Sequence, residues 1–163
     1  MERTTTKYLQ RKAREMLSKN AANRRVAAID GYLMALESLG SEANHSVSFD
    51  FRRIEGTVDR ARDAALAAMG EGMKIELTPL ADWKRELAND LLQGYIPTAL
   101  GPELREEIAQ GLLILLNRAC SDTASAWRVV ATPTDGKYFH CAWSTYLFPT
   151  PDGLFLLHCA IDD

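Results

Sequence analysis

The sequence predicts an α+β fold, in which about five helices are followed by a three-stranded antiparallel β-meander that packs on them. Through residues 1–120, apolar residues recur every three or four positions, which places them on one face of a helix. Through residues 126–162, aromatic and β-branched residues dominate and are interrupted twice by Asp-Gly. We expect one α+β domain, because 163 residues suit a single hydrophobic core.

The first two helices are expected to form a hairpin. In residues 6–19, apolar and basic side chains fall on opposite arcs of a helical wheel. Asn20 then suits the N-cap of a second helix, which ends near Gly40. We expect the first helix to bury its apolar arc against the rest of the protein, and this arc consists of Leu9, Ala13, Met16 and Leu17.

Three further helices are expected before the meander. The third covers residues 51–69, where apolar residues recur at steps of three and four, although the residues just before it alternate as in a strand. The fourth begins at Thr78-Pro79, because Thr suits the N-cap and Pro the first helical position, and it ends at Gly94. The fifth begins at Pro102, and its strongly apolar second half is expected in the core.

Each Asp-Gly in the meander suits a three-residue hairpin loop, which determines the strand register. This register pairs Trp127 with Trp143 and Thr145 with Cys159. Because side chains alternate along a strand, one apolar face is expected to cover the helices, and it collects Trp127, Val129, Ala131, Phe139, Cys141, Trp143, Leu147, Leu157, Cys159 and Ile161. The opposite face is expected to form a protein contact surface that includes Tyr138, His140, Tyr146, Leu156 and His158.

Positive charge is concentrated at the N-terminus. Residues 1–25 contain eight Lys or Arg and two acids, a net charge of +6, whereas the remaining residues contain eleven and twenty, a net charge of −9. This polarity can serve self-association or binding to an anionic partner such as nucleic acid. The basic residues expected to bind such a partner are Arg3, Lys7, Arg11, Arg14, Arg24 and Arg25.

The three cysteines are expected to be reduced thiols that bind no metal, since their number is odd and no CxxC spacing occurs. The His-Cys pairs at 140–141 and 158–159 provide zinc-ligand chemistry, but neighbours in a strand point to opposite faces. We therefore expect neither a metal nor a cofactor. No apolar run approaches the roughly 20 residues that span a bilayer, so a cytoplasmic protein that does not enter membranes is expected.

Catalytic residues are harder to find in this sequence. Tyr146 and His158 are expected to be cross-strand neighbours, with Ser144 on the same face, and such a group can support nucleophilic or acid–base chemistry. However, the sequence contains no GxSxG elbow, Walker loop or HExxH motif. A satisfied polar pairing on the sheet is therefore the favoured interpretation of these three residues.

These observations order three hypotheses for function. The first is a non-catalytic protein-binding or regulatory protein that uses the outer face of the C-terminal sheet, which includes use of that face for self-association. The second is a nucleic-acid-associated accessory protein that uses the basic N-terminal helices. The third is a small enzyme centred on His158, Tyr146 and Ser144.

Overall fold

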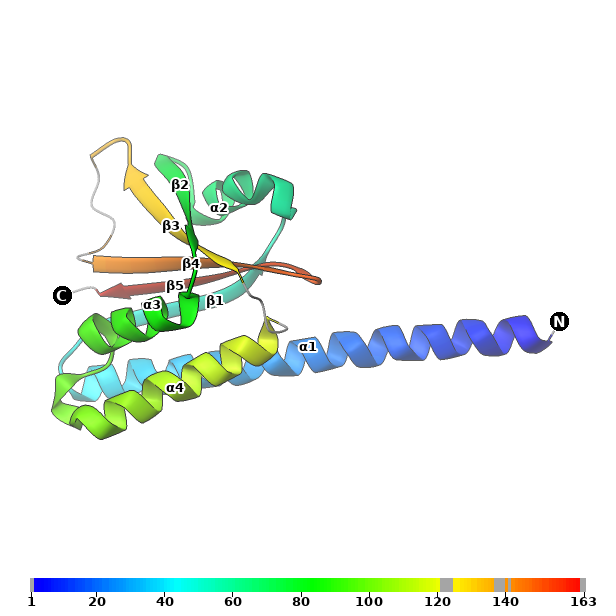
Figure 1. Ribbon diagram of the computed structural model, residues 1–163, viewed down its shortest axis with the longest axis horizontal. Helices are drawn as coiled ribbons and strands as arrows, with labels where there is room; N and C mark the ends of the chain where they lie inside the picture. Colours follow the sequence, from blue (N-terminus) through cyan, green and yellow to red (C-terminus); the bar gives the residue numbers. More distant parts are fainter. Residues whose placement is uncertain (1, 121–124, 137–139, 141, 162–163) are drawn as a thin grey trace.

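The computed structural model describes residues 2–120, 125–136, 140 and 142–161, with side chains from residue 11 onward. The described residues form an α+β fold with four α-helices and five strands (Figure 1). The helices are α1 (Glu2–Glu42), α2 (Ala61–Met69), α3 (Trp83–Asp90) and α4 (Pro102–Ala119). The strands are β1 (Val47–Ile54), β2 (Met73–Leu80), β3 (Ala126–Pro133), β4 (Ala142–Thr150) and β5 (Gly153–Ile161).

The strands form one antiparallel sheet in the order β1-β5-β4-β3-β2, and helices cover both of its faces. Helices α1, α3 and α4 lie on one face and α2 lies on the other (Figure 1). Each face carries its own apolar cluster, with Leu112, Phe148 and Leu157 in the larger one and Ile75, Leu147 and Leu156 in the smaller one. The expected meander is therefore the centre of a larger sheet that is buried on both sides.

Strands β1 and β2 were not predicted from the sequence. The first strand occupies the start of the segment expected to be helical, because Val47–Ile54 pairs residue by residue with β5. Thr78 and Pro79, expected to begin a helix, lie in β2 at the sheet edge, where a proline does not interrupt the ladder. Helix α3 begins after Asp82 instead, whose carboxylate accepts a hydrogen bond from the Arg85 backbone N–H at 3.2 Å.

Helix α1 is continuous through the position where a hairpin was expected. The stretch before Gly31 contains neither Gly nor Pro, and Asn20 lies within the helix rather than at a cap. The second half of α1 packs on the sheet and α4 through Ile29, Leu33 and Leu36. The first half extends beyond the rest of the protein (Figure 1). The two expected helices are therefore a single helix with one anchored half and one projecting half.

The register of the second hairpin was wrong by one residue. Thr150 pairs with Gly153, so Pro151 and Asp152 form a two-residue loop instead of the expected three-residue loop. Cys159 consequently pairs with Ser144 rather than Thr145, and Leu157 and Cys159 belong to the cluster under α1, α3 and α4.

The first hairpin also differs from the prediction. Trp127 pairs with Leu147 instead of Trp143, a shift of four residues. Because this shift is even, Trp127, Val129 and Leu147 still share a face, and that face lies against the smaller cluster under α2. Phe139 and Cys141, expected to pair with β3, lie outside the described residues.

Two glycines within helices provide a matched test of the α1–α4 packing. A Cβ at Gly111 in α4 would overlap the Tyr32 hydroxyl, which donates a 2.8 Å hydrogen bond to the Ile108 carbonyl. A Cβ at Gly31 in α1 has nothing within 4 Å. Gly111→Ala should therefore reduce the free energy of unfolding by about 1–3 kcal/mol. Gly31→Ala should raise it by up to about 1 kcal/mol, since Ala favours helix.

Thermal and urea unfolding of both variants measure these changes. Equal stabilisation by the two substitutions would contradict the close contact between Gly111 and Tyr32.

Candidate functional site

A polar network joins the end of α3 to the centre of the sheet. The Arg128 guanidinium donates to the Asp90 carboxylate at 2.8 Å and to the Tyr146 hydroxyl at 3.0 Å. The Tyr146 hydroxyl donates to the same Asp90 oxygen at 2.5 Å. Glu86, one turn before Asp90, lies 3.6 Å from the guanidinium. The Arg128 guanidinium, the Asp90 carboxylate and the Tyr146 hydroxyl thus form a triangle in which each group contacts the other two.

Three elements place these groups together. Arg128 in β3 and Tyr146 in β4 are direct cross-strand partners, so both side chains lie on the same face of the sheet. Asp90 is the last residue of α3 and is followed by a π-helical turn, Leu91–Tyr95, which closes with a 2.9 Å bond from the Ile96 N–H to the Leu91 carbonyl. Such turns are rare and often occur near functional sites, so the network is a candidate functional site.

The protonation states of the network are determined by burial and by the short hydrogen bonds. Burial alone would raise the pKa of Asp90, but hydrogen bonds from Arg128, Tyr146 and Ser144 outweigh it and lower that pKa. Burial, followed by the bond to Asp90, raises the pKa of Tyr146 well above its usual value. Burial also raises the pKa of the neighbouring Tyr95 to about 12. Asp90 is therefore an acceptor and both tyrosines are donors at neutral pH.

This arrangement is better suited to structure than to proton transfer. A general acid or base works best when its pKa lies near the operating pH, and the Asp90 and Tyr146 pKa values are shifted in opposite directions, away from neutrality. The network satisfies a partly buried carboxylate and guanidinium and attaches α3 to two strands.

The expected catalytic group is divided between the two faces of the sheet. Tyr146 pairs with Leu157 and not with His158, so the expectation that Tyr146 and His158 are cross-strand neighbours is wrong. His158 pairs with Thr145, whose hydroxyl lies 2.7 Å from its Nδ1. Ser144 and Tyr146 lie on the side of Asp90 instead. The one-residue change of register separates the histidine from the other two hydroxyl groups.

The outer sheet face is also different from the expected contact surface. Tyr146 and Leu156 are both 0% exposed, so neither is available to a partner. His140 and His158 are half-buried, and their ring centroids lie 5.3 Å apart, although the register expected from the hairpin loops places these two residues several positions away from each other along the strands. Tyr138 lies outside the described residues. What remains of this surface is the histidine pair.

Two of the three cysteines can be assessed. Cys120 and Cys159 are buried thiols that form no disulfide within the described part of the chain, and burial raises the pKa of Cys120 to about 12. Cys141 lies outside the described residues. Among the residues that the structure describes, no three His, Cys, Asp or Glu side chains are arranged so that they could hold a metal ion. No helix in the described part of the chain is long and apolar enough to cross a membrane.

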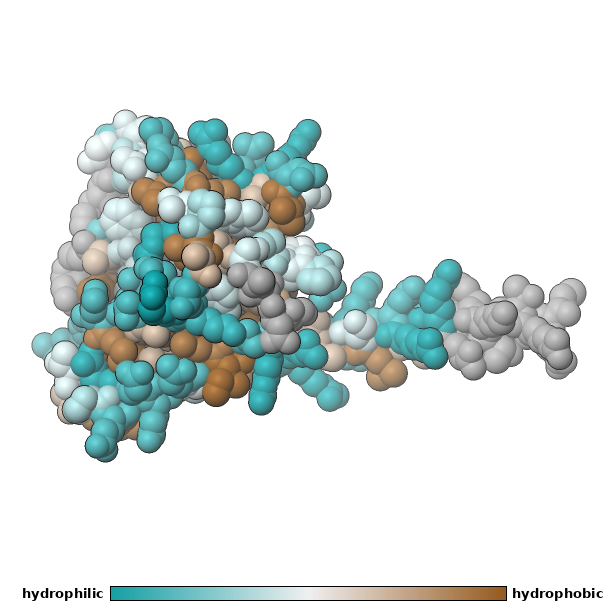
Figure 2. Space-filling view, viewed as in Figure 1, coloured by the Kyte–Doolittle hydropathy of each residue, from teal (hydrophilic) through white to brown (hydrophobic). Residues whose placement is uncertain are grey.

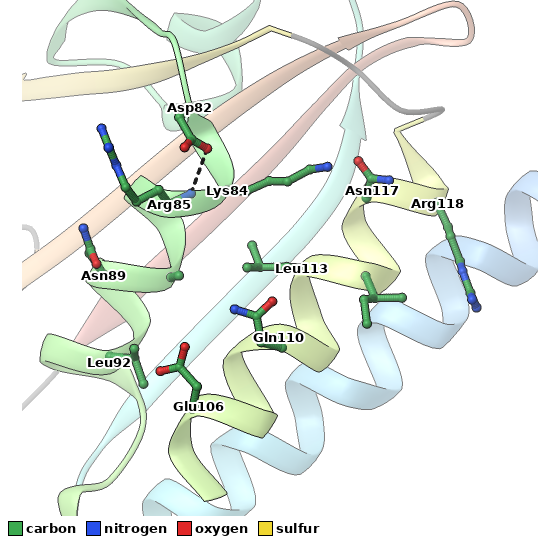
Figure 3. Close-up of a pocket in the computed structure, with 12 residues that line it drawn as sticks. Asp82, Lys84, Arg85, Asn89, Leu92, Glu106, Gln110, Leu113, Asn117 and Arg118 are labelled. Carbon is green, nitrogen blue, oxygen red and sulfur yellow. Dashed lines mark hydrogen bonds between the residues drawn. The ribbon is translucent and has the colours of Figure 1, made fainter. Parts of the chain in front are cut away.

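A groove of about 720 Å³ runs between α3 and α4 (Figure 3). Leu92 lines it from the π-helical turn that follows α3, and Leu113 lines it from α4. Charged and amide side chains, including Lys84 and Asn117, line it further along. At one end of the groove, the Asp82 carboxylate accepts a hydrogen bond from the Arg85 backbone N–H. The groove thus has an apolar strip between polar rims of mixed charge, and its walls do not select one class of ligand.

The projecting segment, which we define as residues 2–25 of α1, exposes apolar side chains to water. Met16 is 59% exposed and Leu17 is 69% exposed, and Ala13 is also exposed. Figure 2 shows apolar patches along this part of the helix. The expectation that this apolar arc packs against the rest of the protein is therefore wrong, because the helix does not turn back.

The predicted basic residues lie on the same segment. Arg11, Arg14, Arg24 and Arg25 are exposed, and Arg25 donates to the Arg118 carbonyl at the end of α4 at 3.2 Å. The backbones of Arg3 and Lys7 are helical, but their side chains are not among those described. The projecting segment therefore combines exposed apolar and basic side chains, and it is the second candidate site.

Sequence reasoning identified Ser144 and Tyr146 but missed their partners Asp90 and Arg128. One signal was available, since Asp90 is an acid at a helix C-terminus, where the macrodipole disfavours negative charge. An acid in that position indicates a nearby cation. Which residue supplies this cation depends on the pairing of β3 with β4, and the loop chemistry did not predict that pairing correctly.

The Asp90 network predicts a pH-dependent contribution to stability. Asp90→Asn removes the charge that holds Arg128 and should reduce the free energy of unfolding by about 1.5–3 kcal/mol at pH 7. Because the Asp90 pKa is lower in the folded protein, this stabilisation is complete above the unfolded pKa near 3.8 and is lost as the pH falls through the folded pKa.

Urea unfolding of both proteins from pH 7 to pH 2 measures the effect. The difference between wild type and Asp90→Asn should shrink in the acid range, whereas a constant difference would mean that the charge does not contribute.

No protein-family model, no curated protein and no solved structure matches this chain.

Proposed function

We propose that the protein is a non-catalytic binding protein that acts by contact between the projecting segment of α1 and another polypeptide chain. The observation that carries this proposal is the exposure of Met16 and Leu17 on a helix that extends away from the rest of the protein. Burial of a large aliphatic side chain contributes about 1.5–3 kcal/mol, so a partner that covers both residues gains substantial free energy.

The stability of the projecting segment supports the same proposal. Isolated helices shorter than about 12–15 residues are marginal in water, and most helical stability in proteins comes from packing of an apolar face. Between residues 11 and 25 nearly every side chain of α1 is exposed. Helical order in this segment depends on the anchored half of α1, and a partner packed against its apolar side would complete it.

The remaining polar site supports a non-catalytic function. Asp90 and Tyr146 are held in opposite protonation states with pKa values displaced from neutrality, and His158 is on the other face of the sheet. Arg128, Asp90 and Tyr146 satisfy one another's hydrogen-bonding groups. A stabilising connection between α3 and the sheet is thus the best account of it.

Photo-crosslinking tests the proposal in cells that produce the protein. A photoreactive amino acid in place of Leu17 should give covalent adducts with a polypeptide, since that side chain lies on the projecting segment. The same amino acid in place of the exposed Glu71, next to β2, is the matched control and should give none. Absence of any protein adduct at position 17, or equal adducts at both positions, would contradict the proposal.

A nucleic-acid-associated function is the second candidate, and the exposed basic residues of the projecting segment favour it. Residues 1–25 carry a net charge of +6 on a helix that phosphates can approach from several sides. Arg11 and Arg14 are both exposed, and Arg11 makes a 3.7 Å surface ion pair with Glu15.

This alternative predicts retention on heparin that falls steeply with salt and is largely lost in the Arg11→Glu, Arg14→Glu double variant. Both residues are exposed, so the free energy of unfolding should change by less than about 0.5 kcal/mol per substitution. Retention measured against salt concentration, with thermal unfolding as the control for folding, checks both statements. Wild-type protein that is not retained, or a double variant that is retained equally, would remove the alternative.

A further inference from the structure

We infer that the partner of α1 is a second copy of this chain, bound as an antiparallel helix pair along the outer side of α1. This inference rests on the proposed function and adds the identity of the partner and the register. It begins from a set of exposed residues, here called the outer stripe, that recur at steps of three and four along α1, namely Ala13, Met16, Asn20, Asn23, Ala27, Gly31, Met34 and Ser38.

Most of the outer stripe lies on the side of α1 that faces away from the rest of the protein. Asn23 and Ala27 are at its edge, where they also line a groove beside the β4–β5 turn. Ile29 and Leu33 point into the core, and at about 100° per residue most of the outer stripe falls on the opposite side of the helix. Met34 is accordingly 66% exposed although it lies in the anchored half. A partner helix can thus follow the outer side of α1 across both the projecting and the anchored halves.

Two methionines define a repeat along this stripe. Met34 follows Met16 by 34 − 16 = 18 residues, which is about five helical turns, so both side chains point in the same direction about 27 Å apart. A twofold axis between the two helices, at the level of residue 25, places each methionine level with the other methionine of the second copy. Residues whose numbers add up to 50 then lie level with each other.

The same register places small residues at the crossing point. Asn23 of one copy lies level with Ala27 of the other, and both are exposed in the isolated chain. Leu17 lies within about 3 Å, along the axis, of the level of Ala35, at one flank of the stripe. The contact thus has a methionine pair on either side of a central crossing at Asn23 and Ala27.

Charge selects the antiparallel arrangement over a parallel one. The first 25 residues carry +6, whereas residues 26–42 of α1 contain three acids and no Lys or Arg, so an antiparallel pair places each basic segment beside the acidic half of α1 in the second copy. At one flank of the stripe, Lys19 lies within one residue of the level of Asp30, and Lys12 lies equally close to that of Glu37. A parallel pair would instead place the two basic segments side by side.

The acidic members of these pairs are suited to accept a cation. Burial and the charge of Asp50 raise the pKa of Asp30, so a lysine beside it would favour its charged form. The Glu37 carboxylate is held in place by a 2.7 Å hydrogen bond from the Phe49 backbone N–H.

Sedimentation equilibrium of the full chain tests the inference. We expect a concentration-dependent species of twice the 18.1 kDa chain mass. Met16→Asp and Met34→Asp should each raise the dimer dissociation constant by at least about tenfold, because each places a charge in both methionine pairs. Val58→Asp is the matched control, since Val58 is 50% exposed outside α1, and it should leave the constant unchanged. Circular dichroism confirms that each variant is folded.

A charge exchange tests the register. Lys19→Asp and Asp30→Lys should each weaken the dimer, and the double variant should recover most of the loss, because both pairs are restored across the twofold axis. A parallel dimer would show no recovery.

The inference is overturned by a chain that stays monomeric at all concentrations, by a dimer insensitive to both methionine variants, or by a double variant without recovery. A monomeric chain that still forms adducts from position 17 with a different protein would remove this inference and leave the proposed function standing. Adducts with the mass of two chains, lost in Met34→Asp, support both.

Discussion

Strand β5 must be buried on both faces, and the rest of the architecture follows from this requirement. It lies between β1 and β4, and its residues point alternately toward two different apolar clusters. Leu154 and Leu156 lie under α2, whereas Leu157 and Cys159 lie under the other three helices. A strand with apolar residues at nearly every position is typical of a sheet covered on both sides. A single layer of helices could not bury both faces of this strand.

The local patterns predicted much of the chain but not its edges. Helix α4 was predicted to begin at Pro102 and does so, because its start signal is local and its long apolar face has only one way to be buried. Strands β1 and β2 were missed, since an edge strand needs only one neighbour and carries polar residues on its exposed side. Their strand character comes from pairing with residues far away in the sequence.

The separation of His158 from Ser144 and Tyr146 has a single cause. The Asp152-Gly153 pair is compatible with two hairpin loops that differ by one residue, and the structure has the shorter loop with Gly153 at φ 120°. One residue of register moves His158 to the opposite face from Tyr146. Loop chemistry restricts the choice of register, but the packing of both sheet faces makes the selection.

Because α1 is continuous, its anchored half determines the direction in which the side chains of the projecting half point. The 41 residues of α1 span about 60 Å, and the direction of every side chain on the projecting half is determined by how Ile29 and Leu33 pack at the other end. Inserting one residue near position 25 would rotate Met16 by about 100° around the axis, whereas a four-residue insertion would return it to within about 40°. The length of α1 can therefore change in steps of about one turn, while single-residue changes would point the same side chains elsewhere.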